Sequence, residues 1–205
     1  MRQEQLVVFV KAPRIGTVKT RLAKSIGAAA ALNAYRCLVE TLLGNLESLP
    51  EVELRFSPDD AFSEIQPWLR DGWRIQPQGN GDLGGRLQRA LGENFSVGAK
   101  RVVIIGSDCP SVNVSDVRAA WSALASHDAV LGPARDGGYW LIGLNASQPL
   151  LFENIPWSTD AVLRETLARA KSTGLRVHHL RELSDVDTEA DWKEFLRQRT
   201  GAISS

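Results

Sequence analysis

Runs of apolar residues of strand length alternate along the chain with segments whose apolar residues recur at helical spacing. The runs at 6–10 and 101–106 are continuous and rich in β-branched residues, as is typical of strands buried on both faces. Further strands are expected at 52–56, 73–76, 129–131, 139–144 and 175–180. Helices are expected at 28–49, 61–69, 83–95, 114–126, 159–173 and 188–199, with Gly174 just past the fifth helix and Thr188 capping the last. The segment between the first strand and residue 28 is expected to be a polar loop.

This alternation predicts an α/β protein: a single-domain, three-layer α/β/α sandwich with a mostly parallel, mixed central sheet. A chain of 205 residues suits one domain, expected to span residues 1–205 with a core at about 6–195. Sheets of this type bind ligands at the carboxyl ends of their strands. Candidate functional residues are therefore sought where strands end.

Composition narrows the class of protein. The 24 Lys and Arg residues balance the 24 Asp and Glu residues, which argues against nucleic acid or membrane partners. The two cysteines, Cys37 and Cys109, exclude a disulfide framework and a four-thiolate zinc site. No stretch is apolar enough for a membrane span or a signal peptide. We expect a cytoplasmic, single-domain protein.

The neutral balance hides a basic segment directly after the first strand. Residues 5–39 contain no acid, and five of their six basic residues lie in KAPRIGTVKTRLAK: Lys11, Arg14, Lys19, Arg21 and Lys24. Lys and Arg neutralise phosphate oxygens, and Gly16 lets the backbone approach a ligand closely. A phosphate cradle and a solvated basic loop both fit this segment.

Acidic residues gather near the other end of the chain. Asp185 and Asp187 follow the last strand, before the helix that Thr188 caps, and Asp108 follows the strand RVVIIG. Part of the acidic run suits the dipole of a helix N-terminus, and Asp108 also suits a turn. Strand-end carboxylates that face a phosphate loop can instead hold Mg²⁺, which prefers a few carboxylates together with phosphates and water.

Six motifs in order carry a family resemblance: FVKAPRIGTVKTRL, QGNGDLGGRL, IIGSDCP, GPARDGGYWLIGL, PWSTD and LSDVDTEADW. They resemble a bacterial glycosyltransferase-like family, also called selenodomain-associated transferases, of the nucleotide-diphospho-sugar transferase (GT-A) superfamily. The opening segment is also similar to that of phospholactate guanylyltransferases and, more loosely, of molybdenum-cofactor nucleotidyltransferases. The resemblance implies the GT-A type of α/β/α fold and a metal-dependent transferase that uses a nucleotide or nucleotide-sugar donor and a small-molecule acceptor.

The same resemblance implies roles for particular residues. Lys19 and Arg21 would grip the donor phosphates and act in catalysis with Asp108, while Lys11, Gly16 and Lys24 would add to the phosphate cradle. Asp108 and Asp187 would hold Mg²⁺ or Mn²⁺. The glycine-bearing loop would bring Gln78, Asp82 and Arg86 to the nucleotide. The turn of Asp136, Gly137, Gly138 and Tyr139 would meet the substrate, although a simple hairpin explains this turn nearly as well.

Other readings compete with the transferase. Gly79, Gly81 and Gly84 match GxGxxG between a strand and a helix, which suggests an NAD(P)-dependent oxidoreductase. Against this reading, Asp82 puts a carboxylate in a loop meant for pyrophosphate, and the motif follows the third expected strand. Cys109 has no neighbouring histidine and is expected to be a buried structural residue. A non-catalytic nucleotide-binding module also fits, and the sequence leaves the choice between glycosyl and nucleotidyl transfer open.

Overall fold

A computed structural model describes residues 3–203 of the chain, with side chains as far as residue 200; residues 1–2 and 204–205 of the expected domain lie outside this range. Within it, seven strands form one sheet in the order β3-β2-β1-β4-β6-β5-β7. The strands are β1 (Glu4–Lys11), β2 (Val52–Ser57), β3 (Arg74–Pro77), β4 (Arg101–Ile105), β5 (Ala129–Pro133), β6 (Tyr139–Leu144) and β7 (Val177–His179). Because β6 alone among them runs antiparallel to its neighbours, the sheet is mixed and mostly parallel, as predicted.

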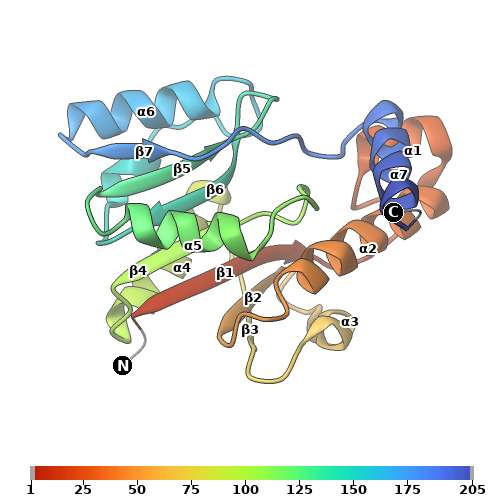
Figure 1. Ribbon diagram of the computed structural model, residues 1–205, viewed down its shortest axis with the longest axis horizontal. Helices are drawn as coiled ribbons and strands as arrows, with labels where there is room; N and C mark the ends of the chain where they lie inside the picture. Colours follow the sequence, from red (N-terminus) through yellow and green to blue (C-terminus); the bar gives the residue numbers. More distant parts are fainter. Residues whose placement is uncertain (1–2, 204–205) are drawn as a thin grey trace.

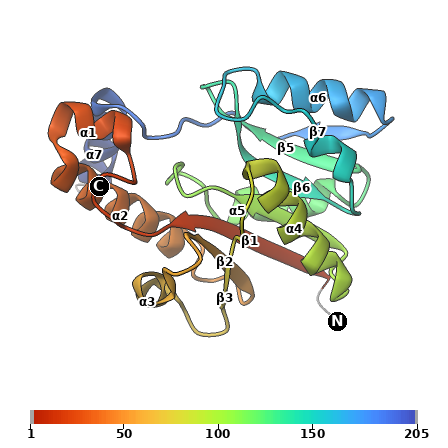
Figure 2. The same ribbon diagram turned by 180° about the vertical axis from the view of Figure 1, so that it is seen from behind.

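Helices cover both faces of this sheet (Figures 1 and 2). They are α1 (Thr20–Ile26), α2 (Ala28–Asn45), α3 (Phe62–Ile65), α4 (Leu83–Ser96), α5 (Val114–Ala123), α6 (Val162–Ser172) and α7 (Glu189–Ile203), with short 3₁₀ turns at Gln66–Trp68 and Pro149–Phe152. The core under α2 and α5 is separate from the core under α4 and α6. The predicted three-layer α/β/α sandwich is confirmed. Within residues 3–203, no helix combines the length and apolar content needed to cross a bilayer.

The central strand β1 shows why the sheet is buried on both faces. Val8 and Val10 pack into the core under α2 and α5, whereas Val7 and Phe9 pack into the core under α4 and α6. Alternate side chains of a strand point to opposite faces, so a continuous apolar run serves both cores. In register, Val8 of β1 lies beside residues of β2 and β4, which flank it in parallel.

The second face is not apolar throughout. Under α4, beside β2 and β3, Glu53 and Arg55 form an ion pair in which each side chain is 1% exposed. Arg55 also pairs with Glu93 of α4 at 2.5 Å, and Glu53 pairs with Arg74 of β3 at 3.1 Å. These charges are stable in the interior because each carboxylate and each guanidinium has a partner.

One expectation for the first fifth of the chain is wrong. The segment after β1 is not a polar loop throughout, because residues Thr20–Ile26 form the helix α1. Its buried residue Leu22 packs with Ala31 and Ala34 of α2 and with Trp192 of α7. Two of the basic residues, Arg21 and Lys24, are therefore held on a helix. The other expected elements are present with shifted ends; α6, for example, starts at Val162.

The last helix lies far from the last strand. An extended segment, residues 180–188, runs from β7 across to α7, which packs beside α1 and α2 (Figure 1). Val186 and Phe195 form a small core with Leu38 of α2, and Trp192 stacks on Phe195. Thr188 accepts a hydrogen bond from the backbone N–H of Asp191, so it caps α7 as predicted. We call residues 180–188 the crossing segment.

Candidate active site

A cleft of about 840 Å³ lies at the carboxyl ends of β1 and β4. The chain runs from β1 outward to β2 and β3, and α4 then carries it back to β4 on the other side of β1. Such a change of direction leaves a crevice between the two strands, where open α/β sheets bind ligands. Because β6 is antiparallel, its first residue, Tyr139, enters at the same end. Segments distant in sequence therefore meet at this cleft.

Lys19 lies at the centre of the charged residues. Its side chain is only 2% exposed, and its Nζ lies 2.5 Å from Oδ1 of Asp108 and 3.1 Å from Oδ1 of Asp187. Lys19 immediately precedes α1. Its backbone is in the left-handed conformation (φ 47°), which residues other than glycine rarely adopt. Arg21 adds a longer ion pair to Oδ2 of Asp187, at 3.7 Å.

The charges of the cluster raise the pKa values of Lys19 and Asp185. Burial alone would lower the pKa of the Lys19 ammonium, but the carboxylates of Asp108 and Asp187 outweigh it and raise this pKa above its ordinary value. Asp185 lines the same cleft, and burial, together with the negative charges of Asp108 and Asp136, raises the pKa of its carboxyl to about 7. Lys19 is therefore a permanent cation among several acids.

The crossing segment brings Asp185 and Asp187 to the cleft. Leu183 bonds to the end of β5, with its N–H donating to the Pro133 carbonyl at 3.1 Å. The backbone N–H of Val186 donates to the carbonyl of Asp108 at 3.0 Å. Asp191 accepts hydrogen bonds from the backbone N–H groups of Asp187 and Thr188. Asp187 is thus fixed between β4 and the start of α7.

A tyrosine from α2 holds the two central strand ends together. The Tyr35 hydroxyl accepts the Lys11 N–H at 2.7 Å and donates to the Lys11 carbonyl at 3.1 Å. It also lies 3.3 Å from the Ser107 hydroxyl, at the end of β4. Burial raises the pKa of Tyr35, so this phenol stays neutral. Sequence reasoning missed Tyr35 and Ser107, because only the fold shows that this α2 residue reaches the crevice.

The glycine-bearing loop after β3 is held by its own polar side chains. Gln78 is 4% exposed and donates through Nε2 to the carbonyls of Val10 and Arg55. Its Oε1 accepts from Arg86, which also bonds to Ser57 and to the carbonyl of Gly81. The amide of Gln78 is therefore committed to the protein, and this residue positions the loop rather than presenting a free group to the cleft.

The chain is similar to known proteins in both sequence and structure. A family model described as "Uncharacterized protein conserved in bacteria (DUF2064)" matches residues 44–159, more than half of the chain. The chain belongs to the DUF2064 family. A protein of Desulfovibrio desulfuricans G20, whose crystal structure is described as a nucleotide-diphospho-sugar transferase, is 33% identical, with a TM-score of 0.90. This match covers 97% of the DUF2064 chain and 88% of the other. The resemblance and the GT-A type of fold predicted from the motifs are confirmed.

More distant structures share the fold alone. CMP:2-keto-3-deoxy-manno-octonic acid synthetase complexed with CTP has a TM-score of 0.61 at 11% identity, and the match covers 98% of this chain and 99% of that one. Rv0371c of Mycobacterium tuberculosis H37Rv, solved as a complex with manganese, has a TM-score of 0.51 at 18% identity, with coverages of 96% and 98%. A comparison with curated proteins gives no match.

The fold of this DUF2064 chain gathers most of the residues that the sequence points to. Those lining the cleft are Lys11, Lys19, Arg21, Gln78, Asp82, Arg86, Asp108, Asp136, Gly138, Tyr139 and Asp187. Gly16, Lys24 and Gly137 are not among the lining residues. Arg14 turns away to pair with Asp60 and Glu64. Asp185, one of the strand-end carboxylates considered for Mg²⁺, also lines the cleft. Asp160 lines it without having been assigned a role, and the PWSTD motif was its signal in the sequence.

The dinucleotide reading of GxGxxG fits this DUF2064 structure poorly. The loop follows β3, an edge strand, whereas the crevice lies beside the central strand β1. Asp82 caps α4 by accepting the Gly85 N–H, so a carboxylate occupies the helix N-terminus that a pyrophosphate would need. A side-chain carbon on Gly84 would lie 2.9 Å from Nε1 of Trp157, so this glycine makes room for an indole. Cys109 is buried, as predicted, and burial raises the pKa of its thiol to about 11.

The donor set suits a divalent cation that shares its shell with phosphates. Asp108 and Asp187 both approach one cation, the Lys19 ammonium, so a position flanked by two carboxylates already exists. Within the described part of the chain, no three His, Cys, Asp or Glu side chains form a complete metal site. Mg²⁺ is commonly bound by one or two carboxylates plus substrate phosphates and water. The residues therefore fit Mg²⁺ or Mn²⁺ bound together with a nucleotide.

Proposed function

We propose that this chain is a metal-dependent transferase that takes a nucleotide donor and passes a glycosyl or nucleotidyl group to a small-molecule acceptor. The observation that carries the proposal is the meeting of Lys19 with Asp108 and Asp187 at the crevice beside β1. A cation and two carboxylates at a strand-order switch point suit a nucleotide's phosphates and their metal. The relationship to the Desulfovibrio protein described as a nucleotide-diphospho-sugar transferase supports the same class.

In this proposal the segment after β1 binds the donor phosphates. Lys19 and Arg21 offset the negative charge that grows on the leaving phosphate, and Lys11 adds a third cation lining the cleft. Gly16 has a left-handed backbone with open space around it, and Lys24 is exposed on α1, so both extend the cradle outside the cleft lining. Gln78 and Arg86 hold the loop that carries Asp82 toward the nucleotide.

Asp108 and Asp187 would hold Mg²⁺ or Mn²⁺, which when bound neutralises phosphate charge and stabilises the leaving group. Manganese in Rv0371c and CTP in the octonic acid synthetase, both proteins of this fold, are consistent with such a pair of ligands. With a cation held by these two carboxylates, the Lys19 ammonium would pair with phosphate oxygens of the donor.

Two reactions fit this arrangement. In glycosyl transfer, an acceptor oxygen bonds to the anomeric carbon of a nucleotide-sugar, and the bond from that carbon to the nucleoside diphosphate breaks. In nucleotidyl transfer, the acceptor oxygen bonds to the α-phosphorus of a nucleoside triphosphate, and pyrophosphate leaves. Both leaving groups keep the electron pair of the broken bond and carry new negative charge beside Lys19 and Arg21.

Thermal unfolding with candidate ligands tests the proposal. Nucleoside triphosphates, UDP- and GDP-sugars, and NAD(P) are each added with and without Mn²⁺. A ligand at about 100 times its Kd stabilises the fold by roughly 2.7 kcal/mol, which is a clear rise in Tm. We expect a rise that needs both Mn²⁺ and one nucleotide or nucleotide-sugar, followed by release of pyrophosphate or nucleoside diphosphate when acceptors are supplied.

The matched variants are Asp108→Asn and Asp71→Asn. The first keeps the shape of the side chain but removes a charge from the cluster, and it should abolish the metal-dependent part of the stabilisation. The second changes an exposed acid in the turn before β3, away from the cleft, and should behave as the natural chain does. Stabilisation by NAD(P) without metal, or equal behaviour of the two variants, would reject the proposal. Binding without turnover would indicate a nucleotide-binding module.

A further inference from the structure

The walls of the cleft differ in charge. On one side, Lys11 ends β1, and Lys19 and Arg21 follow it. On the other side lie two loops, one joining β5 to β6 and one preceding α6, and they contribute Asp136 and Asp160 to the lining. The volume of about 840 Å³ is at the upper end of the range that ligand pockets usually span, so a donor and an acceptor can share it. We call the second side the acidic wall.

The two loops of the acidic wall form one surface. Gly137 has φ +88°, and a side-chain carbon there would lie 2.2 Å from the backbone carbonyl oxygen of Asp160. The Leu163 N–H, in the first turn of α6, donates to the Gly137 carbonyl at 2.9 Å. Oδ1 of Asp136 accepts the Gly138 N–H at 2.9 Å, which fixes the carboxylate at the tip of the turn. The wall is therefore built before any ligand arrives.

An aromatic side chain completes this wall. Trp157 lines the cleft and packs on the first turn of α4, where Gly84 lets the indole come close. With Tyr139 it also packs against the core under α4 and α6, so the ring is held in place. A fixed aromatic ring beside carboxylates offers an apolar surface for C–H groups and acceptors for O–H groups. These are the two kinds of group that a polyol or sugar ring presents.

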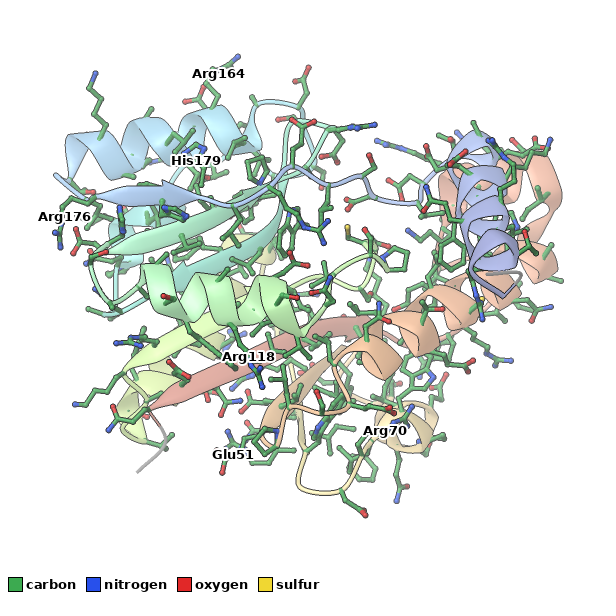
Figure 3. The ribbon with its side chains drawn as sticks, viewed as in Figure 1. Glu51, Arg70, Arg118, Arg164, Arg176 and His179 are labelled. Carbon is green, nitrogen blue, oxygen red and sulfur yellow. The ribbon has the colours of Figure 1, made fainter. Side chains whose placement is uncertain are left out.

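The charge of the acidic wall is not balanced by nearby cations. Asp136 and Asp160 are both exposed to solvent, and among the described residues neither forms an ion pair. Arg164 of α6 pairs with Glu165 and lies on the outer side of its helix (Figure 3). Arg176 pairs with Asp128 at the edge of the molecule far from α1 and α7. Arg135, next to the turn, pairs with Glu182.

We infer that the acceptor is an uncharged polyhydroxylated molecule, a sugar or polyol, whose hydroxyl groups donate to Asp136 and Asp160 while its ring or carbon chain packs on Trp157. A phosphate or carboxylate on the acceptor would meet two unpaired carboxylates and be repelled. The inference rests on the proposed function and names the second substrate of the same cleft.

The transfer step then uses a hydroxyl group as nucleophile. The acceptor oxygen forms a bond to the transferred anomeric carbon or α-phosphorus, and the bond from that atom to the leaving phosphate oxygen breaks. The leaving group departs with the electron pair. The hydroxyl proton passes to the Asp136 carboxylate, which is exposed and returns it to solvent.

The test compares matched pairs of molecules in the presence of the donor nucleotide that stabilises the protein, at saturating concentration with Mg²⁺. The pairs are glucose and glucose 1-phosphate, myo-inositol and inositol 1-phosphate, and glycerol and glycerol 3-phosphate, with binding followed by saturation-transfer NMR. Filling the donor half first keeps the phosphorylated probes from binding to Lys19 and Arg21. We expect at least one neutral probe to bind about tenfold more tightly, or better, than its phosphorylated partner, because the partner's charge faces like charges.

The double variant Asp136→Asn, Asp160→Asn keeps the size of both side chains and the acceptor oxygen that Gly138 uses. It should bind the donor nucleotide unchanged, while the preference for the neutral member of each pair falls below about threefold. Asp71→Asn serves again as the control and should keep the preference. Tighter binding of any phosphorylated probe by the natural chain overturns the inference. So does a preference that survives in the double variant, or no probe binding at about 10 mM.

The first step separates this inference from the function beneath it. If no nucleotide stabilises the protein with a metal, the proposed function itself fails and the acceptor stage is not reached. If a nucleotide binds but the pairs behave otherwise than expected, the nucleotide-dependent transferase stands and the neutral acceptor falls.

Discussion

The ammonium of Lys19, at the start of α1, lies 2.5 Å from Oδ1 of Asp108, which follows β4. Lys19 makes this contact from a left-handed backbone conformation, which costs a non-glycine residue about 1–2 kcal/mol. Strain of this kind persists where the surrounding structure enforces it, and it is concentrated at functional sites. Asp187 takes part in the same cluster, so one cation and two carboxylates meet at one point of the cleft.

Replacing Lys19 should change metal and nucleotide binding in opposite directions. Lys19→Ala leaves Asp108 and Asp187 without the cation between them, so their affinity for Mn²⁺ should rise by about tenfold or more. The affinity for the nucleotide should fall by about tenfold, because a phosphate partner is lost. Electron paramagnetic resonance of free Mn²⁺, without nucleotide, measures the first effect, and calorimetry measures the second. Unchanged Mn²⁺ affinity would show that Lys19 does not occupy the cation position.

The buried ion pair of β2 gives a prediction about stability. Glu53→Leu leaves Arg55 with only Glu93 as a partner and should lower the free energy of unfolding by about 3–5 kcal/mol. The double variant Glu53→Leu, Arg55→Met also removes the buried cation and should recover most of this loss, because the remaining Arg74 and Glu93 side chains are 33% and 50% exposed to water. Urea denaturation of the two variants and the natural chain measures the difference. Equal losses in the single and double variants would mean that packing, not charge, dominates there.

The turn of the acidic wall gives a second stability prediction. Gly137→Ala combines a left-handed backbone with a carbon 2.2 Å from the Asp160 carbonyl oxygen, and should cost roughly 3 kcal/mol or more. Gly98→Ala is the matched control, because Gly98 has φ +97° and open space around it, and should cost about 1–2 kcal/mol. Thermal unfolding compares them. A smaller loss for Gly137→Ala than for the control would show that the two loops separate easily.

The cysteines should differ in their reactivity toward a thiol reagent. Because burial raises the pKa of Cys109 to about 11, only about 0.1% of it is thiolate at pH 8, and the thiolate is the reactive form. Cys37 is partly exposed. Titration at pH 8 should therefore detect one fast thiol per folded chain and two in urea. Cys109→Ser should leave the folded count unchanged, and two fast thiols in the folded chain would contradict the buried thiol.

The fold could be predicted because its strands and helices are strongly periodic, but α1 could not. This helix is only seven residues long, has one buried residue, Leu22, and begins after Lys19, whose left-handed backbone is not a usual helix start. Its stability comes from contacts with α2 and α7, which are remote in sequence. Local pattern therefore indicates a loop where tertiary packing makes a helix.

In the candidate site, too, the order of elements predicts some features and tertiary contacts decide the others. That Lys19, Asp108 and Asp187 follow strands, and so lie at one edge of the sheet, can be deduced from the order of elements. The hydrogen bonds from the Gln78 amide to the carbonyls of Val10 and Arg55 cannot be deduced in this way, because they depend on the register of three strands. The role of Asp160 depends on the contact between its carbonyl and Gly137, which no spacing rule contains.

The crossing segment makes completion of the cleft depend on a helix that is synthesised after every strand of the described sheet. A growing chain that ends before residue 189 already contains all the strands of the described sheet, but it lacks α7, which anchors Asp187 beside Lys19. In such a chain, Lys19 would face Asp108 without its second carboxylate partner held in place. Lys19, Asp108 and Asp187 thus come together only when α7 has docked on α1 and α2, and a chain that stops before residue 189 would carry the sheet without the complete charged cluster.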